Sequence, residues 1–560
     1  MPELSSADHS VSPPTISIPR QYNAAYDLIE RNLRAGRGDK LAYIDDFGSY
    51  TYSDLARRVD RCAAAFLRLG LQPEQRVFLC LQDTIDFPTA FLGSIKAGLV
   101  PVAANTLLTT ADYDYMLRDS RACALIVSEP LLAQFEPLRD AIPTLKHWIV
   151  AGQPPDSQAL VGSQPRIDSP SRAESASPAA SSFATLLARD AEPVPAAETC
   201  PDDACFWLYS SGSTGAPKGT IHVHGSLIQT AELYGRAILG IRPDDVVFSA
   251  AKLFFAYGLG NALTFPLSVG ATTVLMAERP TPDAVFARLR RHRPTVFCGV
   301  PTLYSSLLAN PALPSPADVP LRACVSAGEA LPREIGERWR RHFDVDILDG
   351  IGSTEMLHIF LSNRPGAVNY GTTGCAVPGY QLRLVDDECH PVPTGEIGEL
   401  QVAGPTAAAG YWNNREKTRH TFCGPWLRTG DKYYVNESGC YVHAGRTDDM
   451  LKVGGIYVSP VEVEAVLLSH PAVLEAAVIG KADDGDLVKP LAFIVLNTGF
   501  DPTDSLASEL KQWVKSRLAP YKYPRWIQFS AALPKTATGK IQRFKLRDLA
   551  ATVACAAPLH

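Results

Sequence analysis

The sequence lacks the features that mark exported and membrane-spanning proteins. Its N-terminal stretch, MPELSSADHSVSPPT, has no basic segment followed by an apolar one, so it does not fit an export signal. Its apolar runs are short, and the window 91–102 is interrupted by Lys96, Gly98 and Pro101. We therefore expect a cytoplasmic protein with no membrane partner.

Metal, disulfide and nucleic-acid patterns are also missing. The twelve cysteines are scattered without a C-x-x-C pair, and Cys200 and Cys205 are the closest two. This spacing supports neither a zinc site nor a disulfide framework, so we expect reduced, mostly buried thiols. The net charge of −6 comes from interspersed acidic and basic residues. No basic stripe is present, which argues against a nucleic-acid partner.

The pattern of the first half predicts an α/β fold. Near-continuous apolar strands over 76–81, 100–105 and 124–128 alternate with a helix around 87–97, as expected of a largely parallel sheet. Before them, apolar spacing predicts a helix that begins near Tyr22. The run 41–55 predicts a hairpin with its turn at Asp46 and Gly48, followed by a helix with Ser53 as its N-cap.

The length of 560 residues calls for at least two domains. Residues 1–20 are rich in Ser and Pro, and we expect them to be disordered or draped over the surface. Residues 152–184, with many Pro, Ser and Ala, predict a flexible surface insertion. A β-rich stretch follows residue 380, and the composition changes after Gly445. We therefore predict an N-terminal domain over 21–447 and an α+β C-terminal domain over 448–560.

The strongest functional signal is the stretch 206–224, FWLYSSGSTGAPKGTIHVH. Its two ends, 206–209 and 220–223, have the composition of strands. The glycines between them let backbone N–H groups approach an anion, and the hydroxyls and Lys218 add donors for phosphate oxygens. A plain Gly/Ser linker would not be flanked by two strands. The stretch therefore predicts a phosphate-binding loop.

Two common phosphate loops do not fit this stretch. A Walker loop needs G-x-x-x-x-G-K-[ST] leading into a helix, but Lys218 stands between Pro217 and Gly219. The nearby pair Gly258 and Gly260 lacks the third glycine of a dinucleotide fingerprint. The loop instead resembles the signature of the adenylate-forming superfamily, which includes acyl- and aryl-CoA synthetases, luciferases and peptide-synthetase adenylation domains.

The resemblance implies a fold and a set of ATP ligands. The fold would be α/β, with a large N-terminal domain of mixed or parallel sheets, a distorted β-barrel-like subdomain, and a small mobile α+β C-terminal domain. The loop residues that would bind the phosphates of ATP are Ser210, Ser211, Gly212, Ser213, Thr214, Gly215 and Lys218.

Further segments match the superfamily in the expected order. In SAGEALP, backbone at Gly328, Glu329 and Ala330 would pack against adenine. In DGIGSTE, Asp349, Gly350, Ile351 and Gly352 would bind the nucleotide, Thr354 would donate to the α-phosphate, and Glu355 would hold Mg²⁺. Taken alone, these could be an ordinary strand-to-helix turn and a solvated loop carboxylate. Their collinear order favours the family.

The resemblance also assigns roles near the C-terminal domain. Asp431 would accept the ribose hydroxyls, and Arg446 would reach the ribose or phosphate, although a plain turn and a surface ion pair are the alternatives. Asp448 matches the hinge, and Gly454 and Gly455 would line the CoA tunnel. In PKTATGKIQR, Lys540 would bridge the carboxylate and the α-phosphate during adenylation.

The acid pocket resembles that of benzoate–CoA ligases. The run AKLFFAYGLGN and the segment GIGSTEMLHIFLSN carry this likeness, although an apolar run of this kind is more often plain core. By resemblance, the pocket residues would be Phe255, Ala256, Tyr257, His358 and Ile359. A short, flat pocket of this composition suits one aromatic ring better than a long acyl chain.

The sequence therefore predicts an AMP-forming aryl-CoA ligase that converts benzoate, ATP and CoA to benzoyl-CoA, AMP and pyrophosphate through benzoyl-adenylate, in the catabolism of aromatic compounds. Its catalytic residues would be Thr354, Glu355 and Lys540, with ATP, Mg²⁺ and CoA required and a monomeric or homodimeric state. Two alternatives stay open: a ligase for a hydroxy-, amino- or halobenzoate, or an adenylating enzyme that loads an aryl acid onto a carrier protein. A non-catalytic nucleotide-binding protein is disfavoured because Glu355 and Lys540 are both present.

Overall fold

The structure is a computed structural model that describes residues 2–152, 180–189, 192–210, 216–447, 449–453, 456–483, 487–519, 521–535 and 541–554. Its chain forms two compact units, which are described separately below. Unit 1 comprises Met1–Pro280, Ser353–His358 and Pro405–Arg419, and unit 2 comprises Thr281–Gly352, Ile359–Gly404 and His420–His560. The domain boundary predicted between residues 447 and 448 lies inside unit 2 and stays a prediction.

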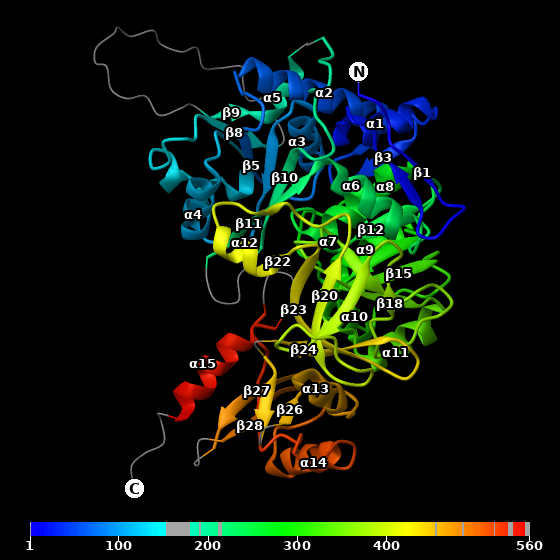
Figure 1. Ribbon diagram of the computed structural model, residues 1–560, viewed down its shortest axis with the longest axis vertical. Helices are drawn as coiled ribbons and strands as arrows, with labels where there is room; N and C mark the ends of the chain where they lie inside the picture. Colours follow the sequence, from blue (N-terminus) through cyan, green and yellow to red (C-terminus); the bar gives the residue numbers. More distant parts are fainter. Residues whose placement is uncertain are drawn as a thin grey trace. The chain divides into compact units, whose positions relative to one another are not determined.

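Unit 1 is built on an eight-stranded sheet with the strand order β21-β11-β10-β6-β5-β7-β8-β9. Figure 1 labels β5, β8, β9, β10 and β11 of this sheet. From β10 to β9 all neighbours are parallel, whereas β11 and β21 are antiparallel additions at one edge. The largely parallel α/β sheet predicted from the sequence is thus confirmed. Its strands are β5 (Arg76–Cys80), β6 (Val100–Ala103), β7 (Ala124–Ser128), β8 (His147–Ala151), β9 (Ser181–Ser182), β10 (Ala204–Ser210), β11 (Lys218–Val223) and β21 (Gly410–Tyr411).

A second run of strands in unit 1 has the order β12-β13-β3-β4, and β1 pairs with β2 in a separate hairpin. These strands are β1 (Ser6–Asp8), β2 (Thr15–Ser17), β3 (Leu41–Ile44), β4 (Ser49–Thr51), β12 (Val246–Ser249) and β13 (Thr272–Val274). The helices of unit 1 are α1 (Ala24–Arg34), α2 (Tyr52–Arg68), α3 (Asp86–Lys96), α4 (Thr110–Ser120), α5 (Phe183–Ala188), α6 (His224–Thr230), α7 (Ala256–Leu259) and α8 (Phe265–Val269). Two π-helices, η3 (Ala231–Arg236) and η4 (Gly260–Thr264), interrupt the regular helices, and two 3₁₀-helices are η1 (Glu129–Gln134) and η2 (Glu136–Leu138).

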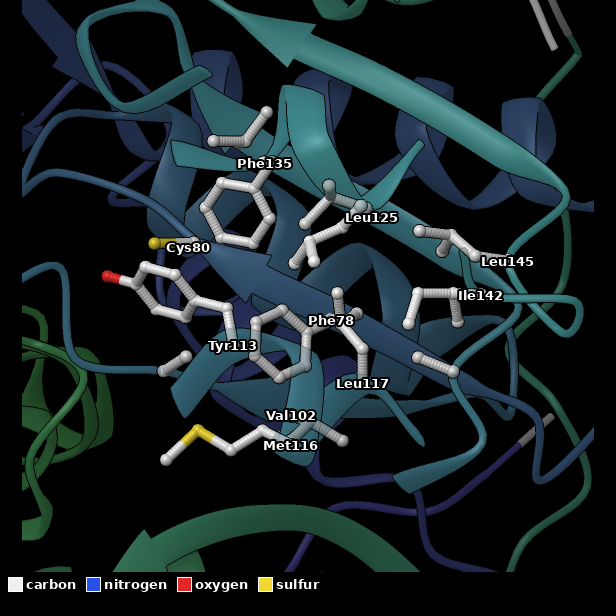
Figure 2. Packing of buried hydrophobic residues seen from close by; sticks show 14 of the residues in the cluster. Phe78, Cys80, Val102, Tyr113, Met116, Leu117, Leu125, Phe135, Ile142 and Leu145 are labelled. Atoms are coloured by element: carbon white, nitrogen blue, oxygen red, sulfur yellow. The ribbon is translucent and has the colours of Figure 1, made fainter. Parts of the chain in front are cut away.

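One core cluster packs against the eight-stranded sheet (Figure 2). Phe78 and Val102 come from adjacent parallel strands, and Tyr113 comes from α4. The ring of Tyr113 stacks on Phe135 with centroids 4.4 Å apart. Removing such rings from water contributes roughly 1.5–3 kcal/mol each, so this cluster fixes the sheet that carries β10.

The N-terminal segment is more ordered than predicted. Residues 1–20 were expected to be disordered or draped, but β1 and β2 pair in this segment. The hydroxyl of Ser5 donates to Asp27 at 2.6 Å, and His9 lies 2.7 Å from Glu232. Polar side chains that meet buried charges hold this Ser- and Pro-rich segment in place, so the expectation of disorder was wrong.

Two further expectations for unit 1 need correction. The predicted helix after the β3–β4 hairpin is capped by Thr51, not Ser53, because Thr51 and Asp54 form a reciprocal capping box. The predicted flexible insertion over 152–184 ends earlier than expected, since Ser181 pairs with Ile149 of β8 and Phe183 is buried in α5. Residues 153–179 of the insertion lie outside the described part of the chain.

Unit 2 contains a run of strands ordered β14-β15-β16-β17-β18, of which β14, β15 and β16 are parallel. The β-rich stretch predicted after residue 380 forms a five-stranded antiparallel sheet, β19-β20-β23-β22 with β24 paired to β23. The bounds are β14 (Val296–Gly299), β15 (Ala323–Ala327), β16 (Ile347–Gly352), β17 (Ile359–Ser362), β18 (Cys375–Ala376), β19 (Gln381–Val385), β20 (Gly398–Ala403), β22 (Phe422–Cys423), β23 (Trp426–Val435) and β24 (Tyr441–Arg446).

The C-terminal part of unit 2 has the predicted α+β composition. Its sheet has the order β27-β28-β29, and β25 pairs with β26. These strands are β25 (Leu451–Val453), β26 (Ile456–Val458), β27 (Val473–Ala482), β28 (Val488–Leu496) and β29 (Trp526–Phe529). The helices of unit 2 are α9 (Pro282–His292), α10 (Pro301–Ala309), α11 (Arg333–Phe343), α13 (Pro460–Leu468), α14 (Asp504–Lys515) and α15 (Arg543–Ala554), and α12 spans Arg415–Thr421.

Candidate active site

The phosphate-binding loop predicted from the sequence connects two paired strands. Ser210, at the end of β10, is the register partner of Lys218, at the start of β11. The antiparallel pairing therefore holds both ends of the loop at one edge of the unit 1 sheet. The loop residues Ser211, Gly212, Ser213, Thr214 and Gly215 lie outside the described residues. The two strands predicted on either side of this stretch are confirmed, and the phosphate-binding role of the loop stays a prediction.

Glu355 lies beside both ends of this loop. Its Oε1 accepts a hydrogen bond from the Tyr411 hydroxyl at 2.7 Å and lies 3.4 Å from the Ser210 hydroxyl. The Lys218 ammonium lies 4.0 Å from the same oxygen, and both side chains are about 15% exposed. Lys218 also lies 4.5 Å from the centroid of the Tyr411 ring. Because the pair is mostly buried, salt screens its attraction only weakly.

The backbone that carries Thr354 and Glu355 is held from two sides. His222 of β11 donates from Nε2 to the carbonyl oxygen of Thr354 at 2.7 Å, and Ala408 donates to the carbonyl of Glu355 at 2.8 Å. Burial lowers the pKa of His222 to about 4, against a smaller opposite effect of the Thr354 carbonyl. His222 is thus a neutral donor at pH 7. These bonds fix the position of the Glu355 carboxylate relative to β11.

Three aromatic side chains surround the imidazole of His358 in unit 1. Ring centroids of Phe265, Tyr234 and Tyr257 lie 4.6, 5.3 and 5.6 Å from that of His358. Phe255 is the N-cap residue of α7 and Ala256 is buried, and their assignment to the acid pocket stays a prediction. The predicted pocket residues Tyr257 and His358 are therefore brought together, although they are 101 residues apart.

His358 is a neutral, oriented side chain. Burial lowers the pKa of its imidazole to about 3, outweighing the hydrogen bond to the carbonyl of Tyr257. Nε2 lies 3.3 Å from that carbonyl, so it carries the proton, and Nδ1 is an acceptor with no hydrogen-bond partner among the described residues. A Cβ on Gly260 would overlap Cδ2 of this ring and come within 2.7 Å of Nε2. Glycine at position 260 therefore leaves the space that the His358 imidazole occupies.

In unit 2, the segment predicted to bind adenine follows the end of β15. Gly328 has a φ of +100°, a conformation that favours glycine, and Glu329 and Ala330 are half-buried. Strands β15 and β16 are parallel, with Ala327 beside Gly350, so the segment 328–330 after β15 lies next to residues 351–352 at the end of β16. The sequence placed the first motif after a strand, and the register of β15 with β16 brings the second motif beside it.

Asp349, which stays a predicted nucleotide-binding residue, is buried in unit 2. It is 5% exposed, and its Oδ2 accepts from the backbone N–H of Leu331 at 3.3 Å. Burial raises the pKa of the Asp349 carboxyl to about 8. Next to it, a Cβ on Gly350 would meet Cγ2 of Ile359 at 2.8 Å, so this glycine allows β17 to pack on β16. The Asp349 carboxyl therefore holds the segment 328–331 through the backbone N–H of Leu331.

Asp431 and Arg446 are neighbours on β23 and β24. Nη1 of Arg446 donates to both carboxylate oxygens of Asp431, at 3.2 and 3.1 Å, and His443 lies 3.6 Å away. Burial raises the pKa of Asp431, but Arg446 and His443 outweigh it, so the net pKa lies below the ordinary value. An ionised carboxylate retains acceptor sites for further hydroxyl donors. The pair predicted from two separate motifs thus forms one ionic group.

Other predicted residues lie outside the described part of the chain. These are the hinge residue Asp448, the tunnel residues Gly454 and Gly455, and Lys540. Their assignments stay predictions.

Sequence reasoning missed Tyr411 and His222, which contact the predicted residues Glu355 and Thr354. His222 could have been found, because on the strand that follows the loop it lies two residues after Thr220, and these two side chains share the buried face. Tyr411 had no local signal, since its position depends on the pairing of β21 with β11.

Among the described residues no group of three or more His, Cys, Asp or Glu side chains is arranged to hold a metal ion. The described helices likewise include none with the length and apolar character needed to span a membrane.

The eleven cysteines that the structure describes are all free thiols. Cys62, Cys80, Cys123, Cys205, Cys298 and Cys324 are buried, whereas Cys375, Cys389 and Cys423 are exposed.

Two family models match the chain. The AMP-binding enzyme model matches residues 29–412, and the AMP-binding enzyme C-terminal domain matches residues 462–540. A benzoate–CoA ligase of Thauera aromatica is 62% identical over 547 residues, which cover 97% of this chain and 99% of the relative. A 4-hydroxybenzoate–CoA/benzoate–CoA ligase of Rhodopseudomonas palustris is 50% identical over 95% of this chain and 94% of its own.

Solved structures of similar sequence have the same fold. A benzoate CoA ligase from Burkholderia xenovorans LB400 superposes with a TM-score of 0.85 at 57% identity, over 94% of this chain and all of that one. The anthranilate CoA ligase AuaEII in complex with anthranoyl-AMP gives a TM-score of 0.88 at 42% identity, over 96% of this chain and 99% of that one.

Proposed function

The chain belongs to the AMP-binding enzyme family, and on this premise we propose that it is an ATP-dependent benzoate–CoA ligase. The observation that carries the proposal is the likeness to a benzoate–CoA ligase across nearly the whole chain, at 62% identity. In the first half-reaction a benzoate oxygen attacks the α-phosphorus of ATP, which gives benzoyl-adenylate and releases pyrophosphate. In the second, the thiol of CoA attacks the acyl carbon and AMP leaves.

The acid pocket supports an uncharged aromatic ring. His358 is neutral at pH 7 and lies among the rings of Phe265, Tyr234 and Tyr257. Aromatic side chains of this kind match the face and edge of one ring. Phe255, Ala256 and Ile359 are proposed to complete the contacts with the ring.

The residues beside the predicted phosphate loop are compatible with metal-assisted chemistry. Mg²⁺ keeps several waters and takes one or two carboxylates together with substrate phosphates, so a single carboxylate beside a phosphate loop fits it. Glu355 is such a group, next to Ser210 and Lys218. Bound Mg²⁺ would neutralise charge on the triphosphate. Lys218 and Thr354 are proposed to donate to phosphate oxygens, and Lys540 to the carboxylate and α-phosphate.

Unit 2 carries the residues proposed for the nucleoside. The backbone at 328–330 would face adenine, and Asp431, held by Arg446, would accept the ribose hydroxyls. Gly350, Ile351 and Gly352 would supply close backbone approach to the nucleotide, with Asp349 in the supporting role described above. Asp448 is proposed as the hinge, and Gly454 and Gly455 as part of the CoA tunnel. We further propose that the enzyme works in the cytoplasm, where ATP and CoA are available.

A hydroxybenzoate is the second candidate substrate. Nδ1 of His358 is a buried acceptor without a partner among the described residues, and a ring hydroxyl could donate to it. A relative that shares 50% identity is a 4-hydroxybenzoate–CoA/benzoate–CoA ligase. One ring substituent in an apolar pocket changes binding by only about 1–3 kcal/mol, so both acids can be substrates of one site.

The experiment is an AMP-release assay with benzoate and a panel of hydroxy-, amino- and halobenzoates, with and without CoA. We expect benzoate to give the highest kcat/KM and sustained AMP release to require CoA. If a substituted acid gives a higher kcat/KM, that acid and not benzoate is the preferred substrate. AMP release that needs a carrier protein in place of CoA would contradict the ligase assignment.

A further inference from the structure

Two cysteines of unit 2, Cys375 and Cys440, lie opposite each other on neighbouring segments of the chain. Gly374 forms an antiparallel bridge with Tyr441, and the backbone N–H of Tyr441 donates to the carbonyl oxygen of Gly374 at 2.9 Å. In an antiparallel pair, the next residue on one segment faces the preceding residue on the other. Cys375 therefore faces Cys440, although residues 376–439 lie between them in the sequence.

The two thiols also interact through their side chains. Burial raises the pKa of the Cys375 thiol, and Cys440 raises this pKa further through its charge and a hydrogen bond. Sγ of Cys375 lies 4.0 Å from the carbonyl oxygen of Gly439, the residue that precedes Cys440. Cys375 is exposed and Cys440 is half-buried, so a small oxidant in solution can reach the pair.

The backbone holds both cysteines in place. Cys375 begins β18, which pairs with β17, whereas Cys440 closes the turn between β23 and β24. The N–H of Cys440 donates to Oδ1 of Asn436 at 2.9 Å, and the N–H of Asn436 donates to the carbonyl of Cys440 at 2.9 Å. Facing residues of an antiparallel pair have Cα atoms about 4.5–5.5 Å apart, within the range of about 4.4–6.8 Å found in disulfides. The backbone therefore suits a covalent link between the two.

We propose that Cys375 and Cys440 form a reversible disulfide, which joins β18 to the β23–β24 hairpin, when the protein meets a low-molecular-weight disulfide such as oxidised glutathione. The thiolate of Cys375 attacks one sulfur of the oxidant, whose S–S bond breaks and releases one thiolate. The thiolate of Cys440 then attacks Sγ of Cys375 and releases the second. The protein gives up two protons and two electrons, and the oxidant takes them up to become two thiols. This reaction does not depend on the proposed ligase activity.

The test exposes the reduced full chain to oxidised glutathione at about pH 8.5, where more of the Cys375 thiol is ionised than at pH 7. After alkylation of the remaining thiols and proteolysis, mass spectrometry should find a pair of peptides linked through Cys375 and Cys440. Dithiothreitol should remove the link. Cys440→Ser should instead accumulate glutathione on Cys375, because the second attack is missing. Cys423→Ser, at another exposed cysteine, is the matched control and should form the link at the parent rate.

The link should require the folded protein. In urea that unfolds the chain, the yield of the Cys375–Cys440 link should fall about 10-fold or more, because the two ends of a long loop rarely meet. A yield that urea leaves unchanged would mean that the fold does not bring the thiols together, and would overturn the proposal. Stable glutathione adducts on Cys375 of the parent protein, or links from Cys375 to cysteines other than Cys440, would overturn it as well.

Discussion

The hydroxyl of Tyr411 donates to Oε1 of Glu355 at 2.7 Å, and the same tyrosine ring lies 4.5 Å from the ammonium of Lys218. Tyr411 thus connects the carboxylate proposed for Mg²⁺ with the lysine proposed for phosphate. It sits on β21, at the edge of the sheet beside β11. The contact holds the Glu355 carboxylate beside Lys218.

We expect Tyr411→Phe to lower the rate of adenylation about 10-fold or more, because the Glu355 carboxylate loses a hydrogen-bond donor. The measurement is benzoate-dependent pyrophosphate exchange over a range of Mg²⁺ concentrations, where the variant should need more Mg²⁺. Tyr115→Phe, at an exposed tyrosine of α4, serves as the control. Exchange at the parent rate and the parent Mg²⁺ requirement would show that Tyr411 does not position Glu355.

Gly260→Ala should damage the acid pocket and spare the nucleotide site. The added Cβ would overlap the imidazole of His358, which is buried and cannot move away without disturbing the surrounding rings. We expect the KM for benzoate to rise about 10-fold or more, with the KM for ATP within about twofold of the parent value. Gly48→Ala, whose nearest contact is 3.4 Å, is a control for the loss of a glycine. A parallel rise in both KM values would point to general misfolding instead.

Lys540→Ala should separate the two half-reactions. Removal of one positioned charge typically lowers a rate by about 10²–10³, so pyrophosphate exchange should fall by that factor. Thioester formation from preformed benzoyl-adenylate should change by no more than a few-fold, since the carboxylate has already been activated. Lys545→Ala, an exposed lysine on α15, provides the matched control. If the Lys540→Ala variant catalyses pyrophosphate exchange at the parent rate, the role in adenylation assigned to Lys540 is wrong.

Asp349→Asn should stabilise the protein by an amount that grows with pH. Burial raises the folded-state pKa of Asp349 from 3.8 to about 8, so between these values the unfolded chain releases a proton that the folded chain retains. The folded state of the parent protein therefore loses stability from this group as pH rises through that window. An asparagine removes this cost and can still accept from Leu331.

Urea unfolding at pH 5, 6, 7 and 8 measures the effect. The free-energy difference between Asp349→Asn and the parent protein should increase at each step and level off above about pH 8. Asp283→Asn, an exposed carboxylate on α9, should give a difference that does not change over this range. A difference that stays flat for Asp349→Asn would mean that its carboxyl ionises normally in the folded protein.

Much of the local structure was predictable because it depends on short-range patterns. The strands on both sides of the phosphate loop follow from their apolar composition, and the alternation of strands and helices from Arg76 to Ser128 follows from hydrophobic periodicity. The N-cap of α2 was misplaced because Thr51 and Ser53 are both good caps. Only Thr51 has an Asp three residues later to complete the capping box.

The sequence by itself determined the α/β class, the phosphate loop and the order of the family motifs, because each depends on residues close together in the chain. The tertiary structure decided which distant groups meet: Tyr411 with Glu355, His222 with Thr354, and Glu329 with Ile541. It also decided that Asp349 is buried and neutral at pH 7. Strand order and register set these contacts and the local dielectric environment, and neither is encoded in spacing along the chain.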